Sequence, residues 1–480
     1  MKTPFQLTGL CLVATIALTS GCFDEQFRIP NTNSPTQEAL TETPNRTILA
    51  QTATGIFSQV NTSVGGQIQQ FGLYGRELYN LLGNDPRETG EEIRGPQDPG
   101  GRAGGLFGGY YQAIRTINSY LAAIPKAADL NAAEQAASRG FAKTLMAWHF
   151  YRIAIRSGPL GFPIDVDRPI NAEPAPFVSE QEGFAFVASL LNEAATDLQA
   201  GGGSFPFTMA PGYTGFDTPA SFLQFNRALL AKVEVTRATL VGCGGPCFTS
   251  ALTALGGSFL TTSGLPGSLN DGVFYAYSSA SGEPTNPISE NLTAARYWVH
   301  PSIEAMVQKQ ADGVTDDLRW TAKARKVAEP RILNDLSSDI KPIMFNANTP
   351  TTSVANLDAD IPLIKNEELI LLRAEARLGS GNKQGAIDDI NLIRVNAGGL
   401  APTTLTAASP DADIITEIIY NRTLSLLFEQ GNRWMDHRKY NRLNQLPLDR
   451  AGDVVHPFML VPAGECDNRG LGTPCTPLGN

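Results

Sequence analysis

Histidine and cysteine are scarce in this chain, which has 4 His and 6 Cys among 480 residues. A zinc site needs His or Cys ligands in closely spaced pairs. The histidines are too few and the cysteines too scattered to supply such a set. We therefore expect no metal site, and we expect no cofactor.

Positive charge is also in short supply. Lys and Arg number 37 against 47 Asp and Glu, which gives a formal net charge of −10 at pH 7. Proteins that bind nucleic acid carry a basic patch or stripe, so the charge argues against a nucleic-acid partner. After the N-terminal segment no apolar run reaches the roughly 20 residues that a membrane-spanning helix needs. Any membrane attachment must therefore come from the N-terminal segment.

The marks of several enzyme classes are missing as well. No Gly-x-Ser-x-Gly turn stands between a strand and a helix, and no glycine-rich phosphate loop ends in Lys-Ser or Lys-Thr. Glycoside hydrolysis needs two carboxylates across a cleft, but 18% charged residues supply such pairs by chance. The segment from Asp312 to Asp317 lacks the full pattern of a calcium loop, which favours a solvated turn. We expect a protein without enzymatic activity.

The first residues have the pattern of a secretory signal. Lys2 is positive, and residues 7–17 form a short apolar run that is typical of a signal peptide. The sequence LTSGC at residues 18–22 resembles a lipobox, although Thr19 stands where Leu is usual. We predict a signal peptide over residues 1–21 and a lipid on Cys22. The alternative is an ordinary cleaved signal that leaves Cys22 to pair elsewhere.

The remaining chain divides into a tether and one large unit. Residues 22–45 are polar, with Pro30, Pro35 and Pro44 and no periodicity, which favours a flexible tether. The unit follows over residues 46–480. Apolar spacing and helix-start signals predict its helices at residues 47–60, 110–124, 131–156, 177–198 and 219–240.

Two pairs of cysteines lie in short loops of this exported chain. Cys243 is followed by Cys247, and Cys466 by Cys475. We predict a disulfide in each pair, which in the chain-entropy model contributes about 2–3 kcal/mol for such short loops. A redox-active first pair is the alternative, but no thioredoxin-like strand and helix surround it.

The C-terminal third contains a helical hairpin. Asn366 has the position of a helix cap, with Glu367 and Glu368 in the first turn, where carboxylates suit the helix dipole. A glycine-containing turn at residues 379–381 separates this helix from a second one that begins at Asn382. Two short antiparallel helices of this kind form a tetratricopeptide-like hairpin. Asp413 then caps a helix predicted over residues 414–428.

Several motifs in this third resemble the RagB/SusD family. They are LLRAEA at 371–376, AIDDINLIR at 386–394, LFEQGNRWMDHR at 427–438 and VPAGE at 461–465, and they define a signature region over residues 361–465. Looser matches lie upstream, including GRE at 75–77, GNDPR at 83–87, FPID at 162–165 and FNRALLAK at 225–232. The chain departs from the family pattern at Gln430 and His437.

The resemblance implies a mainly helical fold, in which tetratricopeptide-like hairpins form a scaffold and long loops form a ligand-binding face with few short strands. It also implies a lipoprotein of the bacterial outer membrane that faces the exterior. Such a protein binds an oligosaccharide or a peptide and delivers it to a SusC-like TonB-dependent transporter. The alternatives from other classes are a lipid-anchored tetratricopeptide-type scaffold for protein partners and a surface glycan hydrolase.

The charged residues of the signature motifs need a separate interpretation. Glu429, Arg433, Asp436 and Arg438 look like an acid–base cluster. Carboxylates and guanidiniums on one helix more often pair with each other and with helix ends. We therefore expect a structural role for these residues, and likewise for Glu375 and Arg373.

The ligand site should lie in the loop-rich region of residues 256–360, where short apolar runs alternate with Gly, Pro, Ser and Asn. Sugar rings present apolar C–H faces that stack on aromatic side chains. We predict ligand contacts from Tyr275, Tyr277, Tyr297, Trp298 and Trp320. On a strand, Tyr275 and Tyr277 would share one side. The alternative is that these rings fill the core beneath the loops.

Overall fold

The computed structural model describes residues 37–169, 171–293, 295–348 and 353–479. The expected signal peptide, Cys22 and the tether up to residue 36 lie outside these ranges.

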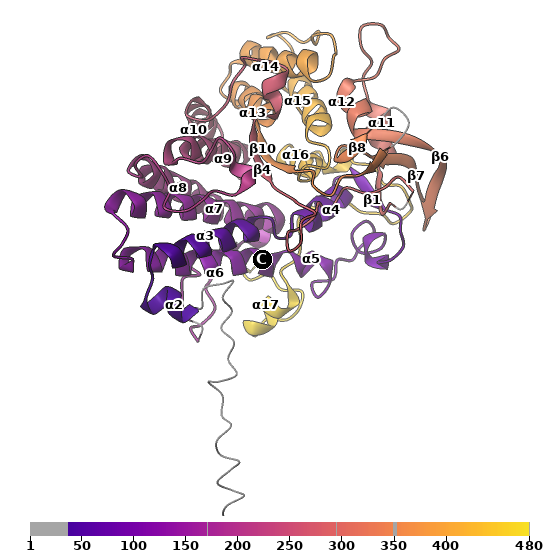
Figure 1. The fold of residues 1–480 in the computed structure, drawn as a ribbon. Helices are drawn as coiled ribbons and strands as arrows, with labels where there is room; N and C mark the ends of the chain where they lie inside the picture. The colour runs from indigo at the N-terminus through magenta and orange to yellow at the C-terminus, as the bar shows by residue number, and fades with distance from the viewer. Residues whose placement is uncertain (1–36, 170, 294, 349–352, 480) are drawn as a thin grey trace, which may run out of the picture.

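Helices make up most of the fold (Figure 1). They are α2 (Gln37–Glu42), α3 (Arg46–Val60), α4 (Val64–Tyr74), α5 (Arg102–Gly105), α6 (Phe107–Ala123), α7 (Ala132–Ser157), α8 (Glu180–Gln199), α9 (Pro219–Leu240), α10 (Gly245–Gly256), α11 (Pro301–Met306), α12 (Leu318–Lys323), α13 (Asn366–Gly379), α14 (Lys383–Asn396), α15 (Asp411–Ser425), α16 (Asn432–Lys439) and α17 (Ala463–Asn468).

The strands of the described residues are short and form five two-stranded antiparallel sheets. The pairs are β1 (Leu78–Asn80) with β5 (Tyr297–Val299), β2 (Phe162–Pro163) with β3 (Phe177–Val178), β4 (Gly272–Tyr275) with β10 (Ile361–Lys365), β6 (Ala324–Leu333) with β7 (Leu336–Pro342), and β8 (Asn346–Asn348) with β9 (Ser353–Ala355). The expectation of a mainly helical protein with few short strands is confirmed.

The long helices stack side by side as successive hairpins. Contacts run from α6 to α7, α8, α9, α10 and α13, and then to α14 and α15. Figure 1 shows this stack on one side of the molecule, with α13 to α15 at the top and the strands β6 and β7 on the other side. This arrangement is the tetratricopeptide-like scaffold that the sequence predicted. Folded structure already begins with α2, inside the segment expected as a tether, where Leu40 is buried.

Local signals in the sequence explain where the central helices begin. The side chain of Asn131 accepts a hydrogen bond from the backbone N–H of Glu134, whose carboxylate accepts one from the N–H of Asn131 in return. Ser179 and Glu182 form the same capping box at α8. Such caps satisfy N–H groups that the helix itself leaves unpaired. They fix the first turn of each long helix.

Close contacts hold the hairpins together. Gly140 of α7 faces Leu198 of α8 so closely that a Cβ atom there would lie 2.6 Å from the Leu198 Cγ atom. The buried amide of Asn226 in α9 donates to the hydroxyl of Thr144 in α7 (2.8 Å) and to the carbonyl of Leu191 in α8 (3.2 Å). Three successive helices therefore share one packed and hydrogen-bonded contact.

Several predicted helix boundaries were wrong by a few residues. The helix expected from residue 177 begins at Glu180, because residues 177 and 178 pair as β3. Asn366 is the first residue of α13 instead of its cap, since its side chain bonds the backbone of Thr261 and Ser268. Helix α15 begins at Asp411 and ends at Ser425, shortly before Phe428 adopts a positive φ of 62°.

Both expected cysteine pairs are joined. Cys243 is bonded to Cys247 at the start of α10, and Cys466 of α17 is bonded to Cys475. Among the described residues, no helix has the length and the apolar character that crossing a bilayer requires.

Candidate functional site

Four buried charged side chains meet where α13, α15 and α16 cross. Arg422 lies between Glu375 and Asp436, with 2.5 Å from its guanidinium nitrogens to each carboxylate, and Lys439 lies 2.5 Å from Glu375. We call these residues the signature cluster. Burial alone would raise the pKa of Glu375, but Arg422 and Lys439 outweigh it and hold the pKa at about 2. Glu375 is therefore a fixed negative charge at neutral pH.

A carboxylate from the N-terminal half anchors the same motif. Glu77 is buried, and its two oxygens accept the backbone N–H groups of Arg433 (2.9 Å) and Phe428 (3.2 Å). Arg433 lies in the first turn of α16, where N–H groups lack partners within the helix, and Phe428 lies four residues before that helix begins. The guanidinium of Arg433 in turn donates to the carbonyl of Arg76 (2.6 Å). The GRE and LFEQGNRW motifs are therefore held together by hydrogen bonds.

The remaining charged residues of the motifs also pair within the fold. Arg373 of α13 contacts Asp389 of α14 at 2.7 Å, which ties the two helices of the hairpin together. Arg438 donates to the carbonyl of Ile155 and lies over the ring of Trp434. These contacts confirm the structural interpretation of the signature residues.

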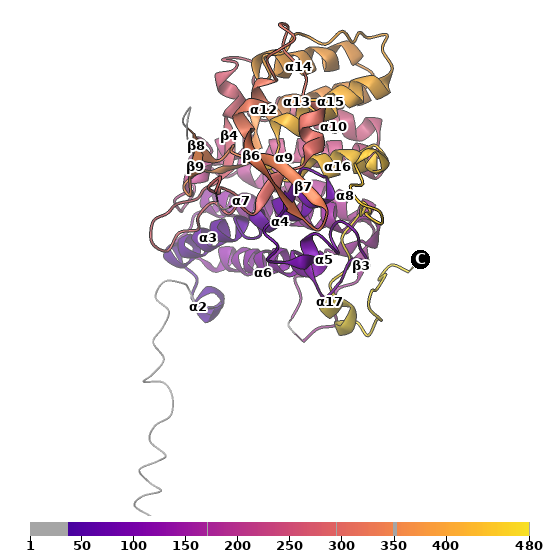
Figure 2. The same ribbon diagram turned by 90° about the vertical axis from the view of Figure 1, so that its right-hand side faces the viewer.

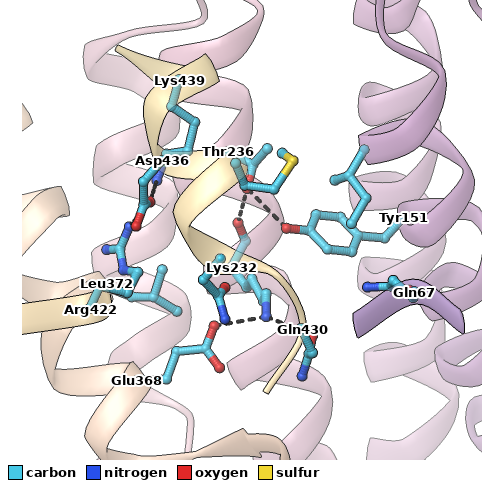
Figure 3. Close-up of a pocket in the computed structure, with 13 residues that line it drawn as sticks. Gln67, Tyr151, Lys232, Thr236, Glu368, Leu372, Arg422, Gln430, Asp436 and Lys439 are labelled. Carbon is cyan, nitrogen blue, oxygen red and sulfur yellow. Dashed lines mark hydrogen bonds and ion pairs between the residues drawn. The ribbon is translucent and has the colours of Figure 1, made fainter. Parts of the chain in front are cut away.

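A small internal cavity lies beside the signature cluster (Figure 3). Its volume is about 30 Å³, and Lys232 of α9 lies at its wall between Glu368 (2.8 Å) and the side-chain oxygen of Gln430 (3.2 Å). A cavity of this size and polarity has room for water, but none for a nutrient. The ligand site must therefore be sought elsewhere.

The five aromatic residues expected to contact a ligand are in the core. Exposed fractions are 1% for Tyr275, 8% for Tyr277, 3% for Tyr297, 6% for Trp298 and 7% for Trp320. The Tyr275 hydroxyl accepts from Trp148 (3.1 Å), and Lys341 lies 3.4 Å above the Trp298 ring. No ring has a face free for stacking. Their burial favours the alternative interpretation, in which these rings fill the core beneath the loops.

An open pocket of about 350 Å³ lies in the same loop-rich region, and we call it the loop-face pocket. It is bounded by β4 and β10, by the end of α12, and by the segments that precede β8 and follow β9. The lining residues are Asn270, Phe274, Ala322, Lys323, Met344, Phe345, Asn346, Asn356, Ala359, Asp360, Pro362, Lys365 and Glu429. Its volume is in the range of small-molecule sites.

One partly exposed aromatic ring lines this pocket. Phe274 stands between Val273 and Tyr275 on β4, and both of these neighbours are buried. Because side chains alternate along a strand, Phe274 points to the pocket side while Tyr275 points to the core. Strand β4 pairs with β10, which lies about 90 residues further along the chain. The sequence pattern alone could not show which side of β4 this pairing would bury.

Two lysines and a carboxylate form the charged wall of the pocket. Glu429 accepts from Lys365 (2.8 Å) and Lys323 (3.2 Å). Burial lowers the pKa of Lys323, despite the opposing effect of Glu429. For Lys365 the same kind of burial is outweighed by Glu429 and Glu367, so its pKa is raised. Lys323 donates to Glu429 and to the carbonyl of Ser425, which leaves one of its three N–H groups for a ligand.

Further polar groups at the rim are available for hydrogen bonding. Asp360 accepts the backbone N–H of Tyr277 (3.0 Å) through one oxygen, which leaves its second oxygen for a ligand. Burial raises the pKa of Asp360. Asn356 accepts from the N–H of Asp358 through its side-chain oxygen (3.1 Å), so its amide N–H groups remain as donors. The pocket therefore combines an apolar ring with donors and acceptors.

Residues 340–452 match the model of the SusD family. The fold of the chain is SusD-like. It resembles that of NanU from B. fragilis, with a TM-score of 0.63 and 15% identity over 92% of this chain and 99% of that one. A SusD superfamily protein from Bacteroides vulgatus gives a TM-score of 0.66 at 16% identity, covering 90% and 98% of the two chains.

A second structure from Bacteroides vulgatus is described as an outer membrane protein with a suggested role in nutrient binding. It gives a TM-score of 0.60 at 15% identity and covers 89% of this chain and 94% of that one. At these identities the likeness establishes the SusD-like fold. No curated protein matches the chain.

One other sequence feature of this SusD-like chain finds a structural explanation. Asp312 accepts the backbone N–H groups of Val314 (2.9 Å) and Thr315 (2.8 Å), which is the solvated turn expected for this segment. Within the described residues, no group of three His, Cys, Asp or Glu side chains could hold a metal ion.

Proposed function

We propose that this SusD-like chain is a surface lipoprotein of the outer membrane that binds a glycan and delivers it to a SusC-like TonB-dependent transporter. The loop-face pocket is the observation that carries the proposal. It presents the Phe274 ring beside the free groups of Lys323 and Asp360. A sugar ring has apolar C–H faces for the first and hydroxyl groups for the others. The relative described with a nutrient-binding role supports the same function.

The composition of the pocket favours binding without turnover. A glycosidase needs a carboxylic acid that can protonate the leaving group. One oxygen of Glu429 accepts hydrogen bonds from both Lys323 and Lys365, so this carboxylate is engaged within the wall of the pocket. In the pocket lining, Asp360 therefore has no second free carboxylate with which it could act as an acid–base pair. A hydrolase remains the less favoured alternative.

The position of the tether is compatible with a membrane anchor on Cys22. Figures 1 and 2 show α2 at the bottom of the molecule, whereas β8 and β4, which bound the loop-face pocket, lie in its upper half. About 15 residues separate Cys22 from α2. Fully extended, they span at most roughly 50 Å. An anchored chain would then hold the pocket away from the lipid surface.

A lipid-anchored scaffold for protein partners is the alternative from a different class. It would use the hairpins α13–α14 and α15–α16 as a binding surface and would need no nutrient pocket. A gene for a large TonB-dependent barrel directly upstream would favour nutrient uptake, and its absence would favour the scaffold.

The test of nutrient binding is a glycan and peptide array probed with the mature, unlipidated chain carrying Cys22→Ser. We expect saturable binding to one class of oligosaccharide. Phe274→Ala should weaken binding about tenfold, because the ring contributes a stacking contact of roughly 1 kcal/mol or more.

The matched control is Phe458→Ala, which removes another partly buried Phe far from the loop-face pocket, beside α9 and α16. It should bind like the parent chain. If the chain binds peptides on the array and no glycans, the glycan proposal is excluded. Equal binding by the Phe274→Ala chain would exclude this pocket as the site.

A further inference from the structure

A second pocket, of about 380 Å³, lies in the loop between α8 and α9. Its lining is mainly apolar at the base and polar at the rim, and we call it the aromatic pocket. The lining residues are Ser204, Phe205, Phe207, Thr208, Met209, Ala210, Pro211, Tyr213, Thr214 and Asp217. None of the signature motifs includes residues of this loop, so the signature does not explain the pocket.

Aromatic rings form a rigid base for this pocket. Phe205 and Phe207 are stacked, with ring centroids 5.3 Å apart and an angle of 26° between their planes. Phe207 also packs on Phe141 of α7 at 4.8 Å, so the pair is fixed to the main core. Phe205 is buried, whereas Phe207 is only partly buried. The exposed part of Phe207 can therefore stack on an apolar ring face without any rearrangement.

The rim supplies exposed polar groups, and the carboxylate among them is not used by the fold. Ser204, Thr208, Thr214 and Asp217 are exposed. Within the described residues, the Asp217 carboxylate makes no hydrogen bond or ion pair, whereas Thr214 donates to the carbonyl of Pro211 (2.7 Å). An apolar base with a free carboxylate at the rim suits a sugar ring, which buries one face and directs its hydroxyl groups outward.

The aromatic pocket and the loop-face pocket share a wall. The 3-10 turn η4 (Pro211–Tyr213), which lines the aromatic pocket, packs directly on β4, which lines the loop-face pocket. A Cβ atom on Gly212 would lie 2.0 Å from the carbonyl oxygen of Phe274. The two backbones are thus in direct contact, and glycine is required at position 212 for this approach. The two pockets are therefore lined by elements that contact each other, η4 in one and β4 in the other.

We infer that the aromatic pocket is a second subsite for the same ligand, so that the chain binds an oligosaccharide long enough to occupy both pockets. This inference rests on the proposed function of the loop-face pocket. One part of the oligosaccharide lies beside Phe274 and the charged wall, and a later part stacks on Phe207. Each pocket contributes separately, so affinity depends on the length of the oligosaccharide.

The test measures affinity against length with oligosaccharides of two to eight sugars from the class that the array selects. The parent chain should bind longer members more tightly, until both pockets are occupied. Phe207→Ala should remove most of this gain, a loss of about tenfold for the longest member. It should change the affinity for the shortest member less than about twofold. Phe274→Ala should weaken every member of the series.

Asp217→Ala is the second variant, because Phe207 packs on the core and its truncation could disturb the fold. The exposed Asp217 carries no such risk, and its loss should weaken binding of long members only. Phe458→Ala is again the control. Unchanged length dependence in both the Phe207→Ala and Asp217→Ala chains would overturn the second subsite while leaving the loop-face pocket intact. Absence of any oligosaccharide binding would instead overturn the proposed function.

Discussion

At the scale of single residues, several carboxylates are buried without full compensation. Glu92 is 1% exposed, and its nearest cation, Arg102, lies 3.6 Å away. Burial raises the pKa of Glu92 to about 7, an increase that Arg102 only partly opposes. Glu77, the residue that anchors α16, also has a pKa raised to about 7 by burial. Both groups should therefore change charge near neutral pH in the folded protein.

The direction of the resulting pH dependence follows from proton binding. The ordinary pKa of Glu92 is 4.5 and its pKa in the folded chain is about 7. Between these values the folded chain holds the proton more tightly than the unfolded chain. The contribution of Glu92 to stability is therefore fully present below pH 4.5 and is lost as the pH rises through 7.

Glu92→Gln removes this titration and should stabilise the chain selectively at high pH. We expect a gain in the free energy of unfolding of about 1–2 kcal/mol at pH 8 and almost none at pH 5. Arg102 keeps Glu88 as a partner at 3.1 Å, so the substitution leaves no isolated cation. Denaturant unfolding of both chains at pH 5 and pH 8 checks this. Glu77 is present in both chains, so its contribution to the pH dependence cancels in the comparison. A gain of equal size at both pH values would contradict the account.

At the scale of elements, helix starts and the C-terminal hairpin followed from the sequence, whereas the orientation of β4 did not. Asn131 and Glu134 form their capping box within one turn, so local spacing is sufficient to predict it. Phe274 and Tyr275 are neighbours on β4, and their side chains point to opposite sides of the strand. The pairing with β10 decides which of these sides is buried. That choice depends on residues far away in the chain. Tyr275 is the last residue of β4 and Tyr277 lies two residues beyond it, and both side chains are buried.

The signature cluster joins three helices, and its loss should be costly. Arg422→Met would leave Glu375 and Asp436 buried with only Lys439 as their remaining cation. Breaking a buried ion pair by removing one partner costs about 3–5 kcal/mol. The matched control is Lys326→Ala, which removes an exposed pair with Glu304 and should cost less than about 1 kcal/mol. Equal stability losses in urea unfolding would show that the cluster does not hold α13, α15 and α16 together.

At the scale of the whole molecule, the helical stack is the scaffold. The loop-face pocket lies in the loop-rich region, and the aromatic pocket lies in the loop between α8 and α9. The family signature lies largely in the scaffold, which explains why it predicted the fold. The residues that line the pockets belong mainly to loops, and their sequence shows no motif that distinguishes one ligand from another. Their placement depends on the packing of β4, β10 and η4.

The anchor is the other property of the whole molecule. If Cys22 carries the lipid, Cys22→Ser should abolish labelling by palmitate and should move the chain from the membrane fraction to the soluble fraction. The described helices all begin downstream of Cys22, from Gln37 onward, so thermal unfolding of the purified variant should be cooperative. A variant that stays in the membrane fraction would contradict the anchor.

The most direct measurement of the central claim is a crystal structure of the unlipidated chain with the oligosaccharide that it binds most tightly. The account predicts an intact sugar chain with one ring beside Phe274, within hydrogen-bond distance of Lys323 and Asp360. A longer ligand should continue over η4 to Phe207. A cleaved sugar, or an intact one bound away from both pockets, would contradict the account.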